Sequence, residues 1–141
     1  MPTLLKLIFI AIALITGYFA QDISSWFSND KQSQLAQYCQ LSTRGCEQES
    51  ITVKLDRDVA QPLMPVQISA TWPNSQSPSL RLTLNGHEMD MGTALFELQA
   101  TGNSLYQAEV LLPACTMENM TWVGQLSDGQ QSISLAIRMA R

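Results

Sequence analysis

The stretch GHEMDMG at residues 86–92 is the part of the sequence richest in groups that could bind a metal ion. It contains the single histidine, His87, and two of the seven methionines, Met89 and Met91. In an extended backbone side chains alternate between two faces, so these three would project to the same side. An imidazole and two thioethers suit Cu(I), whereas Mg²⁺ and Ca²⁺ prefer hard oxygen ligands. The segment therefore predicts a soft-metal site.

A second group of sulfur-bearing residues follows in the segment CTMENM at residues 115–120. It supplies Cys115, Met117 and Met120, and a thiolate at Cys115 would be the strongest donor of the set. We therefore predict a Cu(I) site assembled from both segments. The alternative is that the methionines fill gaps above a β-core, as flexible thioethers commonly do. Met120 stands two positions before Trp122, so both side chains can face that core.

The residue types give little support to an enzymatic function. The single histidine would have to serve as base for a nucleophile such as Cys115, and no orienting partner is recognisable. Phosphate-binding, dinucleotide-binding and nucleophile-elbow motifs are absent from the sequence. One histidine and no CxxC pair argue against zinc, which usually takes four nitrogen or sulfur ligands. We expect the protein not to be an enzyme.

Length and charge narrow the class further. The chain has 141 residues, enough for one domain. Charged residues make up 14% of it, against roughly 25% in an average soluble domain. The formal net charge is −4, and no basic footprint for nucleic acid is present, so nucleic-acid binding is excluded.

Residues 4–20 read LLKLIFIAIALITGYFA and have two interpretations. They fit a secretory signal peptide, but no plausible cleavage site has small residues at both the −3 and the −1 position. They also fit an uncleaved anchor, with Lys6 at the cytoplasmic end and Trp26 and Phe27 at the far interface. We favour the anchor, over residues 1–27, with the N-terminus inside.

A polar segment, residues 28–50, would form a neck between this anchor and the domain. It contains Cys39 and Cys46, which are close enough in sequence to form a small disulfide loop. Export to an oxidising compartment would allow that bond. Pairing of Cys115 with either of the other two cysteines stays open, and in that case Cys115 would be structural.

From residue 51 the hydrophobic pattern has a period of 2, bounded by turn-forming residues. Seven short alternating segments of this kind are typical of an antiparallel sandwich. The fold we predict is therefore all-β, an immunoglobulin-like antiparallel β-sandwich over residues 51–141, behind one N-terminal transmembrane helix. The predicted strands are 51–55, 66–72, 80–84, 94–98, 106–112, 122–126 and 133–139.

Functional groups on such a scaffold lie in the loops between strands. The His/Met segment joins the third and fourth predicted strands, and the Cys/Met segment joins the fifth and sixth. Those two connections need not lie at the same end of a Greek-key sandwich. The two-loop site depends on this point, which the sequence leaves open.

The N-terminal anchor, the small β-sandwich, the G-x-x-M-x-M-G turn and the segment Tyr-x-Ala-x-x-x-Leu-Pro-x-Cys at residues 106–115 resemble proteobacterial membrane-anchored proteins. These are similar in layout to the FixH/YtkA-like family. The resemblance covers residues 1–27 in layout and 51–139 in pattern, and the cysteine loop is not part of it. It implies a periplasmic accessory factor associated with copper handling and the assembly of haem–copper cytochrome oxidases.

We therefore expect a periplasmic domain, held by a single pass in the bacterial inner membrane, that assists copper delivery or oxidase maturation. Its predicted Cu(I) ligands are His87, Met89, Met91, Cys115, Met117 and Met120. The alternative is a docking module of a larger membrane protein complex that binds no metal.

Overall fold

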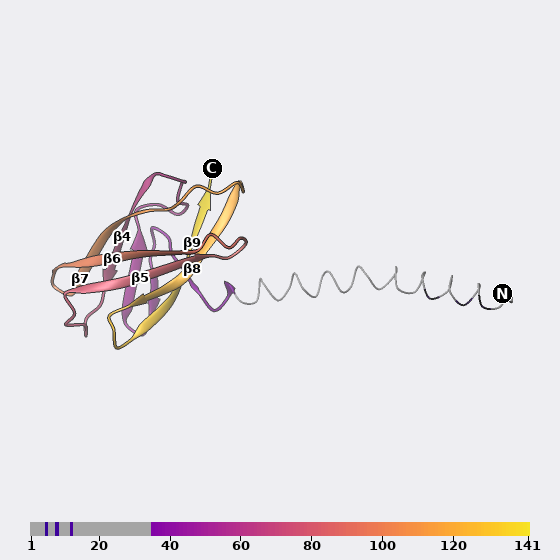
Figure 1. Cartoon of the computed structure of the whole chain (residues 1–141). Coiled ribbons are helices and arrows are strands. Elements are labelled where there is room, and N and C mark those ends of the chain that lie inside the picture. Colours follow the sequence, from indigo (N-terminus) through magenta and orange to yellow (C-terminus); the bar gives the residue numbers. More distant parts are fainter. Residues whose placement is uncertain (1–4, 6–7, 9–11, 13–34) are drawn as a thin grey trace. The chain divides into compact units, whose positions relative to one another are not determined.

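The computed structural model describes residues 5, 8, 12 and 35–141 (Figure 1). The chain divides into two units, Met1–Ala36 and Gln37–Arg141. Among the residues that are described, no helix is both long and apolar enough to cross a membrane. The predicted anchor and the first part of the neck lie largely outside the described residues.

The second unit is an all-β domain, as predicted, with nine strands in a single sheet. The sheet has the order β1-β9-β8-β5-β6-β7-β4-β3-β2, in which β1 runs parallel to β9 and every other pair is antiparallel. The strands are β1 (Cys39–Gln40), β2 (Cys46–Gln48), β3 (Ile51–Leu55), β4 (Pro65–Thr71), β5 (Ser79–Gly86), β6 (Thr93–Gly102), β7 (Leu105–Leu111), β8 (Asn119–Ser127) and β9 (Ser132–Ala140).

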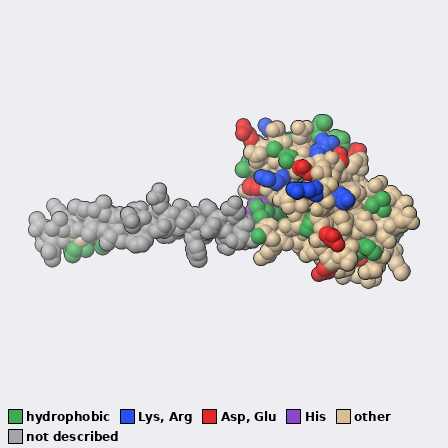
Figure 2. Space-filling model, turned by 180° about the vertical axis from the view of Figure 1, so that it is seen from behind, with side chains coloured by type: hydrophobic (Ala, Val, Ile, Leu, Met, Phe, Trp, Pro, Cys, Tyr) green, Lys and Arg blue, Asp and Glu red, His purple; other side chains and the backbone are tan. Residues whose placement is uncertain are grey.

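Strands β3 to β9 are the seven that the hydrophobic alternation predicts. Leu80, Leu82 and Leu84 of β5 are fully buried, while Arg81 between them is exposed. Both described tryptophans lie in the same core, and among the described residues no polar or charged side chain is buried. Much of the surface in Figure 2 is neither charged nor hydrophobic, in keeping with the low charge of the sequence.

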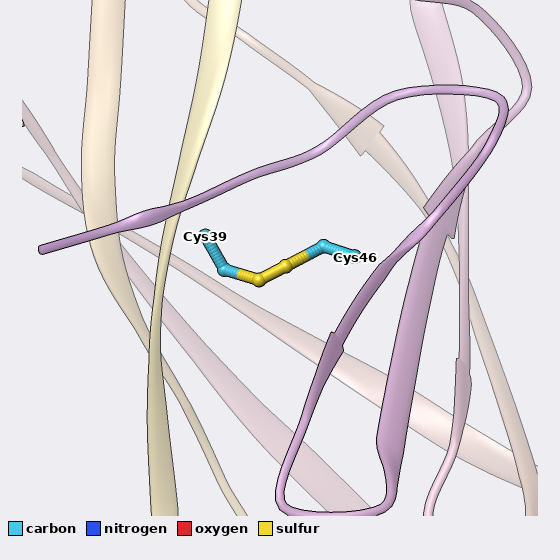
Figure 3. The surroundings of a disulfide bond; sticks show 2 residues. All are labelled: Cys39 and Cys46. Atoms are coloured by element: carbon cyan, nitrogen blue, oxygen red, sulfur yellow. A yellow bond between two sulfur atoms is a disulfide. The ribbon is translucent and has the colours of Figure 1, made fainter. Parts of the chain in front are cut away.

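The two additional strands come from the cysteine loop and join the two ends of the sheet. Cys39 in β1 and Cys46 in β2 form a disulfide with a Cα–Cα distance of 5.9 Å (Figure 3). Since β1 and β2 are the first and last strands of the order, this bond nearly closes the sheet into a barrel. The predicted pairing of Cys39 with Cys46 is confirmed, and Cys115 is a free, buried cysteine.

The predicted arrangement had two antiparallel sheets, whereas the structure has one mixed sheet. Strand β6 pairs with β5 along most of its length and with β7 near its C-terminal end, where the register shifts between Ala100 and Gly102. This strand therefore connects what would otherwise be two layers. The sequence did not predict the parallel β1–β9 pair for two reasons. The pair joins distant parts of the chain, and a strand of two residues is too short to show a hydrophobic period.

Strand directions place four segments at one end of the barrel. These are the connections 56–64, 87–92 and 112–118 and the C-terminal Arg141, which follow or precede paired strand ends. We call this the His87 end. Residues 87–92 and 115–118, which hold most of the predicted ligands, therefore lie at the same end.

Candidate functional site

The β5–β8 pairing brings the His/Met segment against the start of β8. Gly86, the last residue of β5, is paired with Trp122. The next residue continues this contact, because the His87 amide donates to the Thr121 carbonyl at 2.9 Å. The sequence left open whether the two sulfur-bearing segments lie near each other. In the structure, strand β8 carries Met120 directly beside the 87–92 connection.

The 87–92 connection is bent, so the extended row of ligands predicted from the sequence does not form. The β5–β6 ladder ends at the pair Asn85–Thr93, and residues 87–89 form bends. Asp90 accepts a hydrogen bond from the Gly92 amide at 2.9 Å, and Gly92 has a φ of +74°. The physical reason is that a hairpin must reverse direction, which a continuous extended segment cannot do.

Gly86 allows the His/Met loop and the start of β8 to approach closely. A Cβ at this position would overlap the methyl carbon of Met120 and the backbone oxygen of Met89. The Met120 methyl group and the Met89 backbone therefore meet above the glycine. Among the predicted ligands, the structure brings together the 87–91 segment and Met120.

The six predicted ligands differ in their exposure to water. Met89 and Met117 are 37% and 36% exposed, whereas Met120 and Cys115 are 2% and 4% exposed. Met91 is half-buried and packs against the core, and His87 is also half-buried. Met120 lies in the core, as its spacing from Trp122 indicates, but at the edge that touches the His/Met loop.

Cys115 and Met117 are fixed on the other side of β8, beside the end of β9. Arg141 donates through its guanidinium to the Cys115 carbonyl at 2.5 Å and through its amide to the Glu118 carbonyl at 3.0 Å. The Cys115 thiol donates to the Met117 carbonyl at 3.4 Å. The hydrogen bonds that tie this segment to the rest of the domain therefore come from Arg141, which directly follows β9, whereas those of the His/Met loop join it to β8.

The sequence pattern did not single out Glu88, an exposed residue of the His/Met loop. Its Oε2 accepts a hydrogen bond from the Thr121 amide at 2.7 Å. The carboxylate thus ties the His/Met loop to β8. No local pattern indicates this contact, because it joins residues 33 positions apart.

A hollow of about 280 Å³ adjoins this contact. Glu88, Met120 and Arg138 are among its lining residues, which come from the His/Met loop, β8 and β9. Behind the strand, Trp122 is fully buried, and its Nε1 has no hydrogen-bond partner. Of the predicted ligands, the hollow is lined by Met120 alone.

A second polar contact stiffens the His87 end at the barrel seam. The backbone amide and the hydroxyl of Thr43 both donate to Asp58 Oδ1 at 2.8 Å. These bonds, the backbone one most of all, lower the pKa of Asp58 below its ordinary value. The β1–β2 turn and the β3–β4 connection are joined by this contact.

The donor chemistry available at the loop is soft rather than hard. Among the residues that the structure describes, no three or more His, Cys, Asp and Glu side chains group together as a metal site. The predicted site instead offers one imidazole and several thioethers, a set that fits Cu(I) and fits Zn²⁺ or Ca²⁺ poorly.

Comparison with known proteins identifies no relative. No protein-family model matches the chain, and no curated protein matches it. The function has to be argued from the residues themselves.

Proposed function

We propose that this protein is a non-enzymatic accessory protein that binds Cu(I) at the His87 end and assists copper delivery or cytochrome oxidase assembly. His87, Met89, Met91 and Met120 would form the principal ligand set. Cys115 and Met117, held beside β9, would form a second group of sulfur donors. The resemblance to FixH/YtkA-like proteins supports the same proposal.

One observation carries the proposal. The antiparallel pairing of β5 with β8 places the loop that carries His87, Met89 and Met91 against Met120, whose methyl group lies next to the Met89 backbone. Had these strands been apart in the sheet, the two sulfur-bearing segments would have had no common surface. A soft cation needs such convergence because it is held by a few donors in direct contact.

Exposure of part of the ligand set suits a carrier rather than a storage site. Met89 lies partly in water, so an acceptor protein can reach it. Thioethers are weaker Cu(I) ligands than thiolates, and a shallow site of this kind would release the ion to an acceptor with a thiolate. The proposed step is therefore ligand exchange, with no bond of the protein made or broken.

We further propose that the domain lies in the periplasm behind a single N-in span of the bacterial inner membrane. The Cys39–Cys46 disulfide supports an oxidising compartment. The apolar stretch at residues 4–20, with Lys6 near its start, supports the anchor and its orientation.

We also propose that the domain is of the immunoglobulin-like class. Two of its three non-sequential pairings, β4 with β7 and β5 with β8, support a Greek-key path. In this description β9-β8-β5 and β7-β4-β3 are the two layers, and β6 bridges them.

An anaerobic Cu(I) titration of the full chain against a chromophoric chelator tests the copper proposal. The double variant Met89→Leu/Met91→Leu keeps side-chain volume and removes both sulfur atoms. We expect stoichiometric binding by the wild type and a loss of affinity of about tenfold or more in the variant, equivalent to about 1.4 kcal/mol. Met64→Leu, an exposed methionine of the 56–64 connection, is the matched control and should bind as the wild type does.

Equal affinity in the wild type and the double variant would reject this loop as the site. Absence of binding in the wild type would reject copper carriage altogether. The docking module, the second candidate, would then be the better account. It is favoured by the exposed hydrophobic side chains at the His87 end, which include Val59, Leu63 and Met64.

A further inference from the structure

Thr121 in β8 lies where strand β5 would have continued past Gly86. Its carbonyl accepts from the His87 amide at 2.9 Å, as in a regular ladder. Its amide, however, donates to the Glu88 carboxylate at 2.7 Å. A side-chain oxygen thus takes the place of the backbone carbonyl that a continuing strand would have offered.

Because the Glu88 carboxylate replaces a backbone carbonyl as the acceptor, the backbone can leave the sheet while the loop stays bonded to β8. After His87 the chain bends, and the Glu88 side chain reaches back to Thr121. The bend then carries the Met89 carbonyl over Gly86, next to the Met120 methyl group. Charge-assisted hydrogen bonds to a carboxylate are stronger than neutral ones, so this contact holds the loop firmly.

We propose that Glu88 is a positioning residue for the soft-metal site, which latches the His/Met loop to β8 and so sets Met89 beside Met120. This inference rests on the proposed Cu(I) function. We do not count Glu88 among the ligands, because carboxylate oxygen suits hard ions rather than Cu(I), and its Oε2 accepts from the Thr121 amide.

The latch acts by ordering the loop before the ion arrives. Without it the loop samples other arrangements, and the cost of ordering them is subtracted from the binding free energy. Strand β8 itself should persist, because its ladder with β9 runs along its whole length from Asn119 to Ser127. Loss of the latch is therefore expected to affect the loop and the metal affinity, and to leave the fold intact.

The test combines amide hydrogen exchange with the Cu(I) titration on the full chain. In Glu88→Ala we expect faster exchange at the Thr121 amide and a Cu(I) affinity lower by about tenfold, from loss of one charged hydrogen bond. Glu88→Gln, whose amide oxygen can still accept from Thr121, should recover much of both. Glu118→Ala removes an exposed carboxylate from the neighbouring connection and should change neither.

The outcomes separate this inference from the proposed function. If the wild type binds no Cu(I), the proposed function fails and the positioning role fails with it. If the wild type binds and Glu88→Ala binds equally well, the proposed function stands and the positioning role is rejected. An unchanged Thr121 exchange rate in Glu88→Ala would reject the latch itself.

Discussion

Single residues at the edge of the core decide what the His87 end can do. Met120 is buried, yet its methyl group reaches the His/Met loop because Gly86, which it approaches, has no side chain. Met89 meets it there with its backbone and remains partly exposed. Gly86 is thus required by close approach and not by its φ, which is ordinary for a strand. The contact between the two loops depends on this one position.

Gly86→Ala should destabilise the domain, because the new methyl group would overlap Met89 O and Met120 Cε. Overpacking of this kind typically costs about 1–3 kcal/mol. Urea unfolding of the full chain, followed by tryptophan fluorescence, measures the change. Gly92→Asn is the control: the space around Gly92 is open and asparagine tolerates a φ of +74°. A Gly86→Ala variant as stable as the wild type would show that the approach is looser than described.

The shortest strands of this domain lie at the seam of the barrel. Strands β1 and β2 have only two and three residues and are the free ends of the sheet order. Exposed strand edges invite pairing with other chains, and closure removes them. Here the Cys39–Cys46 disulfide joins the two edges, and Leu41, fully buried, follows β1 into the core. The bond therefore helps to hold the seam together, beside the Thr43–Asp58 hydrogen bonds.

The double variant Cys39→Ser/Cys46→Ser should lose about 2.5 kcal/mol of stability, from the loop-entropy expression for a bond that closes roughly eight residues. The loss should be local first. We expect faster exchange at the Leu41 amide, which donates to the Ala136 carbonyl at 2.9 Å, than at the amides of the central strand β5.

Cys115→Ala, which keeps the disulfide, should retain the protection of the Leu41 amide. Equal protection of this amide with and without the disulfide would mean that β1 is held by its pairing with β9 alone. The disulfide would then contribute to stability without holding the seam.

At the scale of the whole domain, hydrophobic exposure is unevenly distributed. Within residues 37–141, five of the seven exposed large hydrophobic side chains lie in the segments of the His87 end, and the other two are Leu111, the last residue of β7, and Leu95 of β6. Leu63 is the most exposed of the five and has a φ of +56°, which is unusual for leucine. Clustered exposure of this kind is typical of interaction surfaces. Both candidate functions need a partner at this end. A copper carrier needs an acceptor that receives the ion, and a docking module needs the protein to which it binds.

A photo-reactive amino acid placed at position 63, and separately at position 95, tests where the partner docks. The two side chains are 62% and 64% exposed, so accessibility is matched. In the cells that produce the protein, we expect a discrete cross-linked product from position 63 and none from position 95. Equal products from both positions, or none from either, would contradict a docking surface at the His87 end.

Much of the fold could be predicted from local patterns. Seven strands follow from alternation of buried and exposed side chains, and this period is fixed by backbone geometry alone. The Cys39–Cys46 bond followed from proximity in sequence. Strands β1 and β2, however, were assigned to the neck because segments of two or three residues carry no period. Their pairing partners, β9 and β3, are what make them strands.

The sequence by itself determined the strands and the types of donor available, since both depend only on neighbouring residues. Tertiary structure alone decided which donors meet. Non-local pairing of β5 with β8 placed Met120 against the His/Met loop. The guanidinium of Arg141, the residue after β9, donates a hydrogen bond to the Cys115 carbonyl. The tertiary structure also gave Glu88 a partner 33 residues away. Such contacts depend on strand order in the sheet, and strand order is set by the packing of the whole core rather than by any local segment.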